Sequence, residues 1–300
     1  MSEKQELAIE VNQLSKSLSG RKVLEDINFQ VKRGTVMGFL GPNGAGKTTT
    51  IKIMLDLVKP DSGSVKILGN GIKDDLLNIK KNIGYVPEVV KLYEYMRIEE
   101  ILKFNRSFYS AWNETLEKKY LSQFNIDRKK KCGELSQGER KQLGLILALV
   151  SDPELVILDE PVVGLDPLRR QELIKIILEE LVVRGKTVFL ASHLLSVVEQ
   201  IADEVVIINK GQICDVRPVS ELKENVKKIR VVFQHQPEPG LLEIPEITEY
   251  EQKGKEYLIS VSKNLDQVVK RLQEEPLFAF EIIDQDLEQI FLQQVKGEDK

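Results

Sequence analysis

One glycine-rich segment carries the residues whose types and spacing best suit phosphate chemistry. It matches the spacing G-x-x-x-x-G-K-[ST] and, with the next residue, comprises Gly41, Pro42, Asn43, Gly44, Ala45, Gly46, Lys47, Thr48 and Thr49. Glycines let a backbone wrap closely around a triphosphate, and the N–H groups at a helix start supply partial positive charge. Lys47 can neutralise phosphate oxygens, and the Thr48 hydroxyl can hold Mg²⁺. The segment therefore predicts an ATP site, against the alternative of a glycine-rich turn with a chance lysine.

Two adjacent carboxylates, Asp159 and Glu160, follow a second apolar run, Leu155 to Leu158. Asp159 suits an Mg²⁺ ligand, directly or through water, and Glu160 can polarise the water that attacks the terminal phosphate. Without the glycine-rich segment, the better interpretation would be two acids that end a strand in solvent. With it, we predict that Glu160 and Lys47 are catalytic.

The apolar patterns around these residues predict the elements that must position them. Thr35 to Leu40 predicts a short buried strand and residues 48–58 a helix, which gives the strand, loop and helix that a phosphate-binding loop requires. Downstream, apolar strands alternate with helices, the strands at 155–158, 187–191 and 204–209 and the helices at 168–183 and 195–202. This alternation predicts an α/β fold with a mostly parallel sheet flanked by helices.

Three other regions have a different character. Residues 7–31 alternate and predict two antiparallel edge strands joined by a turn-rich segment at 15–21. Between about residues 90 and 150, helical spacing replaces the strand signals and predicts a helical insertion. The end of the chain predicts a small α+β domain, with strands at 229–233, 257–261 and 277–283 and helices at 265–273 and 286–295. We therefore expect one domain over residues 1–222 and an accessory domain over residues 223–300.

Composition limits the classes of protein to consider. The chain has 300 residues, 42% hydrophobic and 30% charged, which allows a sizeable core and two domains. A net charge of -4, with acids and bases interspersed, argues against a general affinity for nucleic acid. Cys132 and Cys214 lie far apart without metal-ligand neighbours, which favours a reducing, cytosolic compartment. No apolar stretch approaches the roughly 20 residues that span a bilayer, so work at a membrane would need a partner.

Further motifs resemble those of one family. Leu135 to Glu139, Leu-Ser-Gln-Gly-Glu, opens an apolar helix and resembles the signature sequence of ATP-binding cassette (ABC) ATPases. Gly164-Leu165-Asp166 is similar to the family's D-loop, and His193, at a strand end, to its switch histidine. The resemblance covers about residues 7–216 in the family's order, and the combination is far more specific than any single motif. It implies a P-loop NTPase cassette with an antiparallel β edge layer.

The resemblance also implies roles and partners. In the family, two cassettes pack head to tail, so Ser136 and Gly138 would bind the ATP of a second chain, most simply in a homodimer. His193 would contact the γ-phosphate and orient water beside Glu160. Taken alone, Ser136 is only a good helix N-cap, and His193 only a structural hydrogen-bonder. An integral membrane permease would hold this cytoplasmic subunit at the inner face of the cell membrane, and no nucleic acid partner is expected.

Four positions depart from the family's pattern. Leu18 stands where an aromatic residue usually stacks on adenine, which predicts weaker discrimination between bases. Glu88 replaces the glutamine of the Q-loop, where it could accept a metal-bound water, so we assign it with Thr48 and Asp159 to the metal site. Gln137 and Glu139 replace the usual Gly and Gln of the signature. The Glu88 substitution resembles the export-type branch of the family.

These observations predict an ATP-hydrolysing subunit that powers export of a substrate through a separately encoded permease. The coupling groove of the family would lie near residues 88–96, where aromatic residues are frequent. The alternatives are a soluble ABC-type ATPase that acts on nucleic acid or the ribosome, and a nucleotide sensor that works without a permease.

Overall fold

The computed structural model describes residues 6–109, 111–221, 227–238, 240–261 and 264–284. The chain divides into two compact units, Met1–Val216 and Arg217–Lys300. Each unit has a hydrophobic core of its own. The helix expected at 286–295 lies outside the described residues.

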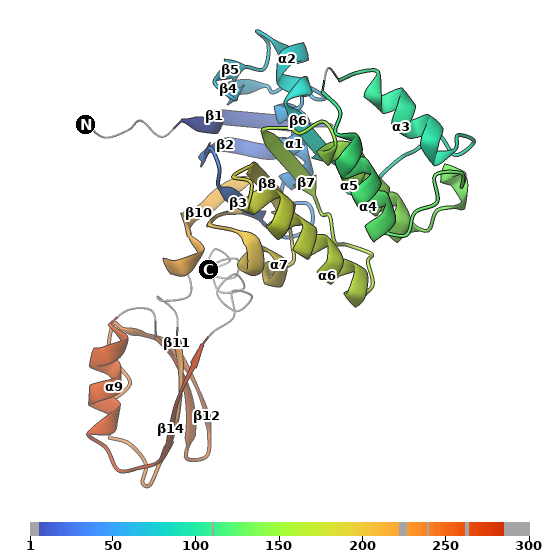
Figure 1. The fold of residues 1–300 in the computed structure, drawn as a ribbon. Coiled ribbons are helices and arrows are strands. Elements are labelled where there is room, and N and C mark those ends of the chain that lie inside the picture. Colours follow the sequence, from blue (N-terminus) through green and yellow to red (C-terminus); the bar gives the residue numbers. More distant parts are fainter. Residues whose placement is uncertain (1–5, 110, 222–226, 239, 262–263, 285–300) are drawn as a thin grey trace. The chain divides into compact units, whose positions relative to one another are not determined.

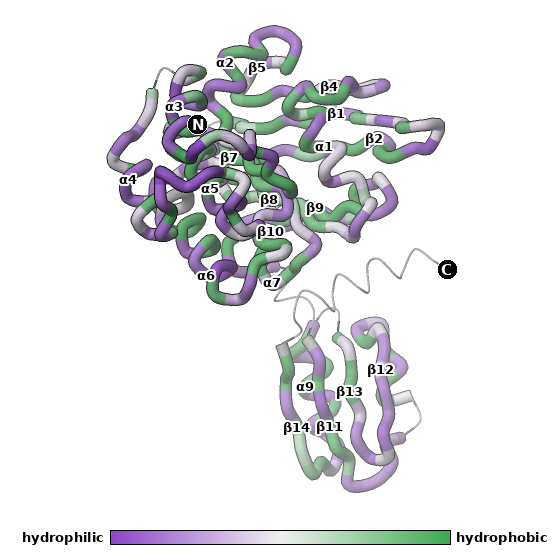
Figure 2. The backbone as a smooth tube through the Cα atoms, turned by 90° about the vertical axis from the view of Figure 1, so that its right-hand side faces the viewer, coloured by the Kyte–Doolittle hydropathy of each residue, from purple (hydrophilic) through white to green (hydrophobic). Residues whose placement is uncertain are grey.

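A six-stranded sheet forms the centre of the first unit (Figure 1). Its order is β10 (Gln212–Pro218), β9 (Glu204–Asn209), β3 (Val36–Leu40), β8 (Thr187–Ser192), β7 (Leu155–Asp159) and β6 (Ile83–Val86). The pairs from β9 to β6 are parallel, and β3, β7 and β8 are buried throughout. Parallel strands buried on both faces must be apolar along their length, as Figure 2 shows for these central strands.

The register of the parallel strands brings the chemically important ends together. Leu40, the last residue of β3, is paired with Ser192, and Asp159, the last residue of β7, is paired with Ala191. The residues that directly follow these strands, Gly41, Glu160 and His193, therefore meet at one edge of the sheet.

Helix α1 (Lys47–Met54) lies between this sheet and a second, antiparallel one. The antiparallel sheet has the order β2 (Arg21–Lys32), β1 (Leu7–Leu18), β4 (Ser62–Ile67) and β5 (Asn70–Gly71). Side chains from both sheets and α1 share one core, in which Phe29, Phe39 and Phe189 contact each other with ring centroids 5.2 to 5.8 Å apart. Helices α6 (Pro167–Ile176), which continues as the π-helix η2 (Ile177–Val182), and α7 (Leu195–Ile201) complete the unit with α2 (Leu76–Lys81).

Several boundaries differ from the sequence-based expectation. The turn between β1 and β2 is confined to Ser19 and Gly20, because the residues on both sides of it are still paired as strands, from Leu18 with Arg21 onward. Helix α1 ends at Met54 and not at residue 58, since Asp56 takes a left-handed φ of 53° and cannot continue a helix. The short strands β4, β6, β10 and β12 were not predicted.

The helical insertion is present between β6 and β7. It contains α3 (Ile98–Arg106), α4 (Glu114–Gln123), the 3-10 turn η1 (Cys132–Glu134) and α5 (Gln137–Leu149). Helix α5 packs against β6, and a Cβ on Gly84 of β6 would lie 2.4 Å from the carbonyl oxygen of Ala148. Among the described residues, no helix is both long enough and apolar enough to cross a membrane.

The second unit is a four-stranded sheet with one helix. Its order is β12 (Ile247–Lys253), β13 (Glu256–Val261), β11 (Lys227–Phe233) and β14 (Leu277–Asp284), and all pairs are antiparallel. Helix α9 (Leu265–Gln273) packs its buried Val268 and Leu272 against the sheet. This is an α+β arrangement.

Candidate functional site

The glycine-rich loop runs from β3 to α1 and needs glycine at specific positions. A Cβ on Gly41 would lie 2.3 Å from the carbonyl oxygen of Ile208, and Gly46 has a φ of 112°. The loop is closed on itself, because the Ala45 amide donates to the Pro42 carbonyl oxygen at 3.2 Å. Glycine therefore lets the loop pass close to β9 and turn directly into helix α1.

Lys47 is buried at the start of α1, with 6% of its surface exposed. Its Nζ donates to the carbonyl oxygens of Gly41, at 2.7 Å, and Pro42, at 3.2 Å. It also lies 3.2 Å from Oε1 of Glu160. The ammonium thus sits inside the loop, where phosphate oxygens would replace some of these acceptors.

Thr48 and Asp159 form a second polar pair. The Thr48 hydroxyl donates to Oδ1 of Asp159 at 3.2 Å. Burial raises the pKa of Asp159 to about 6, and the charges of Glu88 and Glu160 add to this, while the bond from Thr48 and the charge of Lys47 oppose it. The positive charge near Asp159 is therefore too small to offset its burial and the two neighbouring carboxylates. A bound divalent cation would supply the missing positive charge.

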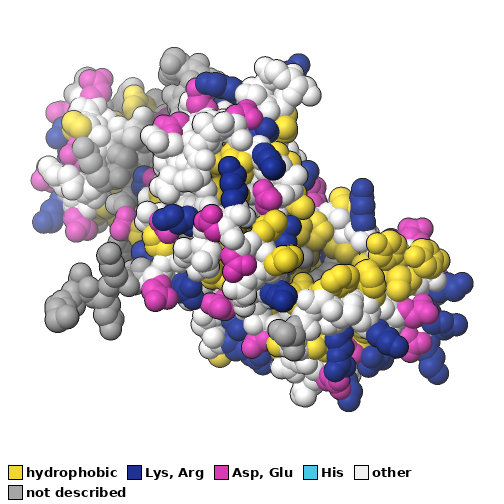
Figure 3. All heavy atoms as spheres, turned by 90° about the horizontal axis from the view of Figure 1, so that it is seen from above, with side chains coloured by type: hydrophobic (Ala, Val, Ile, Leu, Met, Phe, Trp, Pro, Cys, Tyr) yellow, Lys and Arg dark blue, Asp and Glu magenta, His cyan; other side chains and the backbone are white. Residues whose placement is uncertain are grey.

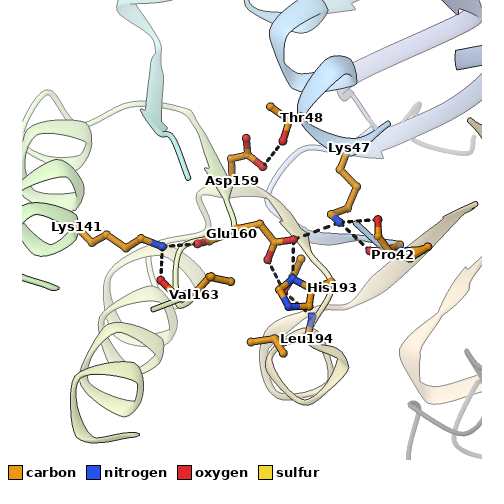
Figure 4. A network of polar contacts seen from close by, with 11 residues as sticks. Pro42, Lys47, Thr48, Lys141, Asp159, Glu160, Val163, His193 and Leu194 are labelled. Atoms are coloured by element: carbon orange, nitrogen blue, oxygen red, sulfur yellow. Dashed lines mark hydrogen bonds and ion pairs between the residues drawn. The ribbon is translucent and has the colours of Figure 1, made fainter. Parts of the chain in front are cut away.

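Glu160 lies at the centre of the network in Figure 4. Its Oε1 is 3.0 Å from Nδ1 of His193 and 3.2 Å from Nζ of Lys47, and its Oε2 accepts a 3.4 Å hydrogen bond from Ser192 Oγ. The residue is 4% exposed and has a left-handed φ of 47°. Asp159 points instead toward Thr48, so the two neighbouring acids face different partners.

Most of the predicted site residues come together. A pocket of about 380 Å³ is lined by Val23, Asn43, Gly44, Gly46, Lys47, Thr48, Thr49, Glu88 and Glu160. Gly41, Pro42 and Ala45 shape its loop, and Asp159 and His193 reach it through Thr48 and Glu160. The glycine-rich loop, Lys47, Thr48 and Glu160 thus line one pocket, and Asp159 and His193 contact residues of its wall.

The remaining predicted residues lie elsewhere. Ser136 and Gly138 are at the N-terminus of α5 and do not line this pocket. Arg169 Nη1 donates to Ser136 Oγ at 3.0 Å. The same Nη1 would lie 2.4 Å from a Cβ added to Gly138. Leu18, 43% exposed at the end of β1, is also outside the lining residues. Its contact with a base therefore stays a prediction.

Three contributing residues were missed. Val23 lines the pocket from β2, Arg169 contacts the signature serine, and Lys141 bonds to the segment that contains Glu160. Lys141 gave no clear signal, because it lies in the polar first part of α5, between Arg140 and Gln142. Val23 and Arg169 gave no signal either, because both sit at positions typical of an ordinary strand or helix.

The chain is similar to known proteins. Residues 24–163 match the family model described as ABC transporter. The bacitracin transport ATP-binding protein BcrA of Bacillus licheniformis is 37% identical over 225 residues, which cover 73% of this chain and 72% of the relative. The chain belongs to the family of ABC transporter ATP-binding proteins.

Two further matches agree with this membership. The Nod factor export ATP-binding protein I of Burkholderia lata is 34% identical over 209 residues, 68% of each chain. A solved structure of an ATP-binding subunit of an ABC transporter has a TM-score of 0.66 at 30% identity, covering 72% of this chain and 92% of that one. The predicted family, the cassette fold and the ATPase class are confirmed. ABC ATP-binding subunits work with membrane permeases and dimerise.

Proposed function

We propose that this chain hydrolyses ATP at the pocket of Lys47 and Glu160 and thereby powers export of a substrate through a separate membrane permease. One observation carries the hydrolytic part: the Glu160 carboxylate is held between His193 and Lys47, at 3.0 and 3.2 Å, beside the phosphate-binding loop. The export part is supported by the bacitracin transport and Nod factor export relatives. Glu88 at the Q-loop position fits the same branch.

The residues divide the work of hydrolysis between them. The loop amides and Lys47 bind the phosphates, so Lys47 exchanges its carbonyl acceptors for phosphate oxygens. Glu160 accepts a hydrogen bond from the attacking water and polarises it. His193 fixes the Glu160 carboxylate and contacts the γ-phosphate.

The donor set fits Mg²⁺. Thr48 Oγ1 and Asp159 Oδ1 are 3.2 Å apart, and Glu88 lines the same pocket, so all three offer the oxygen ligands that Mg²⁺ prefers. Bound there, the ion would neutralise negative charge that develops on the phosphates during hydrolysis. Glu88 in place of a neutral amide adds negative charge to the site.

A second copy of the chain would complete the site. Ser136 and Gly138 offer donors at the N-terminus of the 13-residue helix α5, which suits an anion, but they lie outside the pocket of their own chain. Head-to-tail packing of two chains would place them against the ATP of the partner.

A groove beside the insertion suits the permease. It has a volume of about 410 Å³ and is lined by Tyr85, Pro87, Val90, Leu92, Tyr93 and Phe104, among others. Its rim continues into exposed aromatic rings, with Tyr93 53%, Phe104 42% and Phe108 58% exposed. Figure 3 shows such a hydrophobic band on the right, the side on which α3 lies in Figure 1. A short amphipathic helix from a permease fits this groove, and would hold the subunit at the cytoplasmic face of the membrane.

Mg²⁺-dependent phosphate release by the purified chain tests hydrolysis. Glu160→Gln should abolish turnover and leave ATP binding intact, because the amide keeps the size of the side chain and cannot act as a base. If the variant hydrolyses ATP at the wild-type rate, Glu160 is not the base. If neither protein turns over ATP but both bind it, with or without a permease, the chain is a nucleotide sensor.

Copurification with a permease tests the membrane role. Tyr93→Asp should release the permease, because it places a charge on the apolar rim of the groove. Tyr250→Asp is a matched control, since Tyr250 is a 47% exposed tyrosine of the second unit. Equal recovery of the permease with both variants would argue against docking at this groove.

A further inference from the structure

Lys141 is a buried lysine on the signature helix α5. It is 2% exposed, and its Nζ donates to the carbonyl oxygens of Glu160 and Val163, each at 2.7 Å (Figure 4). Burial lowers the pKa of Lys141, while the charges of Glu88, Glu160 and Asp159 raise it. A buried ammonium must be compensated by such acceptors, so its position relative to the Glu160 segment is well defined.

The segment that Lys141 holds is conformationally demanding. Glu160 has a φ of 47°, a left-handed conformation that is unfavourable for a residue with a side chain. Its amide donates to the Ala191 carbonyl at 2.9 Å, and its carbonyl is bound by Lys141. The carbonyl also accepts a 3.4 Å bond from the Val163 amide within the segment. Both ends of the residue therefore have partners outside the segment, and the side chain that they hold points toward His193 and Lys47.

We propose that Lys141 is a positioning residue for the catalytic base: by binding the carbonyls of Glu160 and Val163, it holds Glu160 in its left-handed conformation. This rests on the proposed hydrolytic function. Lys141 reaches the backbone of Glu160 and not its carboxylate, so it acts through Glu160. Because Ser136 is the N-cap of α5, the same lysine connects the signature to the base. A movement of α5 against a second cassette is then transmitted to the Glu160 carboxylate.

Lys141→Met removes the ammonium and keeps the length and burial of the side chain. Steady-state hydrolysis should show a kcat lower by on the order of 10- to 100-fold, the size of effect expected when a catalytic group is displaced by about 1 Å. The KM for ATP should change less than about threefold, because the phosphate-binding loop is untouched. Gln142→Met is the matched control, since Gln142 is 3% exposed on the same helix. It should keep the wild-type kcat.

Lys141→Arg is the rescue variant. It keeps the charge and can donate to both carbonyls, and a pocket of about 360 Å³ beside Lys141 offers room for the larger head. We expect it to recover most of the kcat that Lys141→Met loses. If Lys141 had a merely structural role, Lys141→Met would lower thermal stability in proportion to its loss of kcat. Gln142→Met would then lower both quantities in the same way.

A crystal structure of the Lys141→Met protein decides the question without turnover. We expect Glu160 to leave its positive φ and Oε1 to move away from His193 and Lys47. An unchanged Glu160, or a wild-type kcat in Lys141→Met, overturns the positioning role. Absence of hydrolysis in the wild-type protein would refute the proposed function alone, and the conformation of Glu160 in the variant would still decide the role of Lys141.

Discussion

Glu160, the base of the proposed reaction, is held in place by its neighbours. Its carboxylate is almost fully buried and contacts a lysine, a histidine and the Ser192 hydroxyl. A buried carboxylate would be costly without such partners. The same partners fix its direction, which a general base needs more than it needs exposure.

Replacement of His193 by Ala should separate orientation of the base from binding of the nucleotide. We expect kcat to fall on the order of 100-fold, because a positioned acid or base contributes this much or more. The dissociation constant for ATP should stay within about threefold, since the phosphate-binding loop is intact.

The chain contains a natural control for this prediction. It has two histidines, and the second, His235, is exposed in the other unit. His235→Ala should hydrolyse ATP at the wild-type rate. Equal rates for His193→Ala and the wild type, measured by phosphate release, would remove His193 from the reaction.

Helix α5 illustrates how an element is started and used. Ser136 accepts a hydrogen bond from the Glu139 amide, and Glu139 accepts one from the Ser136 amide at 2.7 Å, which makes a capping box. Lys130 adds a 3.0 Å bond to Glu139. The glutamate that departs from the family's signature therefore stabilises the helix that presents Ser136.

The stability of this cap should depend on pH. Burial by itself raises the pKa of Glu139, but the bonds from Ser136 and Lys130 outweigh it and lower the pKa from 4.5 to about 2. Because the folded value lies below the unfolded one, ionised Glu139 stabilises the fold above about pH 4.5, and this is lost as the pH falls toward 2. Glu139→Ala should cost about 1 kcal/mol in the free energy of unfolding at pH 7.

Urea unfolding at pH 7 and pH 3 measures this difference. The free energies of unfolding of the two proteins should draw closer at pH 3, because part of the stabilisation from ionised Glu139 is lost between pH 4.5 and pH 2 and the variant has no such carboxylate. Glu139→Gln, which keeps an acceptor without the charge, should lie between them. A difference that stays constant from pH 7 to pH 3 would contradict the role of the ionised cap.

Two glycines of neighbouring elements should respond differently to an added methyl group. At Gly138 the Cβ would meet the end of the Arg169 side chain, which can move, so Gly138→Ala should change the free energy of unfolding by less than about 1 kcal/mol. At Gly84 the Cβ would meet the Ala148 backbone at 2.4 Å, so Gly84→Ala should cost about 1 to 3 kcal/mol.

The two substitutions should rank in the opposite order in their effect on ATP hydrolysis. Gly138→Ala narrows the site that we assign to the partner's ATP and should lower hydrolysis in a protein of normal stability. Thermal unfolding and phosphate release, measured side by side, check both statements. A strongly destabilised Gly138→Ala protein would mean that Arg169 cannot move away.

At the scale of the whole molecule, the site of one chain is divided between two places. The glycine-rich loop and Glu160 line one pocket, which Asp159 and His193 contact, while Ser136 and Gly138 lie outside it. In the head-to-tail dimer that we propose, Ser136 and Gly138 of one chain would complete the pocket of the other.

Mixing two inactive variants tests this arrangement. Lys47→Ala removes the phosphate-binding cation, and Ser136→Asp keeps a good N-cap but repels phosphate. In a mixed dimer, one site joins the intact Lys47 of one chain with the intact Ser136 of the other. An equal mixture should therefore recover hydrolysis to about a quarter of the wild-type rate. No recovery above the two separate variants would argue against the shared site.

The sequence by itself determined the parts of this protein that local chemistry controls. The glycine spacing before Lys47, the apolar strand before Asp159 and the capping pattern at Ser136 each depend on residues close in the chain, so they could be recognised without a fold. The parallel sheet followed from the alternation of apolar strands and helices. The shorter strands β6 and β12 were missed because four to seven residues without strong alternation carry little signal.

Only the tertiary structure decided which of these residues meet. The register of β3, β7 and β8 brings Glu160 to Lys47 and His193, which are separated from it by 113 and 33 residues in the chain. The packing of helix α5 brings Lys141 to the Glu160 carbonyl, across 19 residues. Such contacts depend on how strands pair and how a helix packs on them, and no local pattern specifies that geometry.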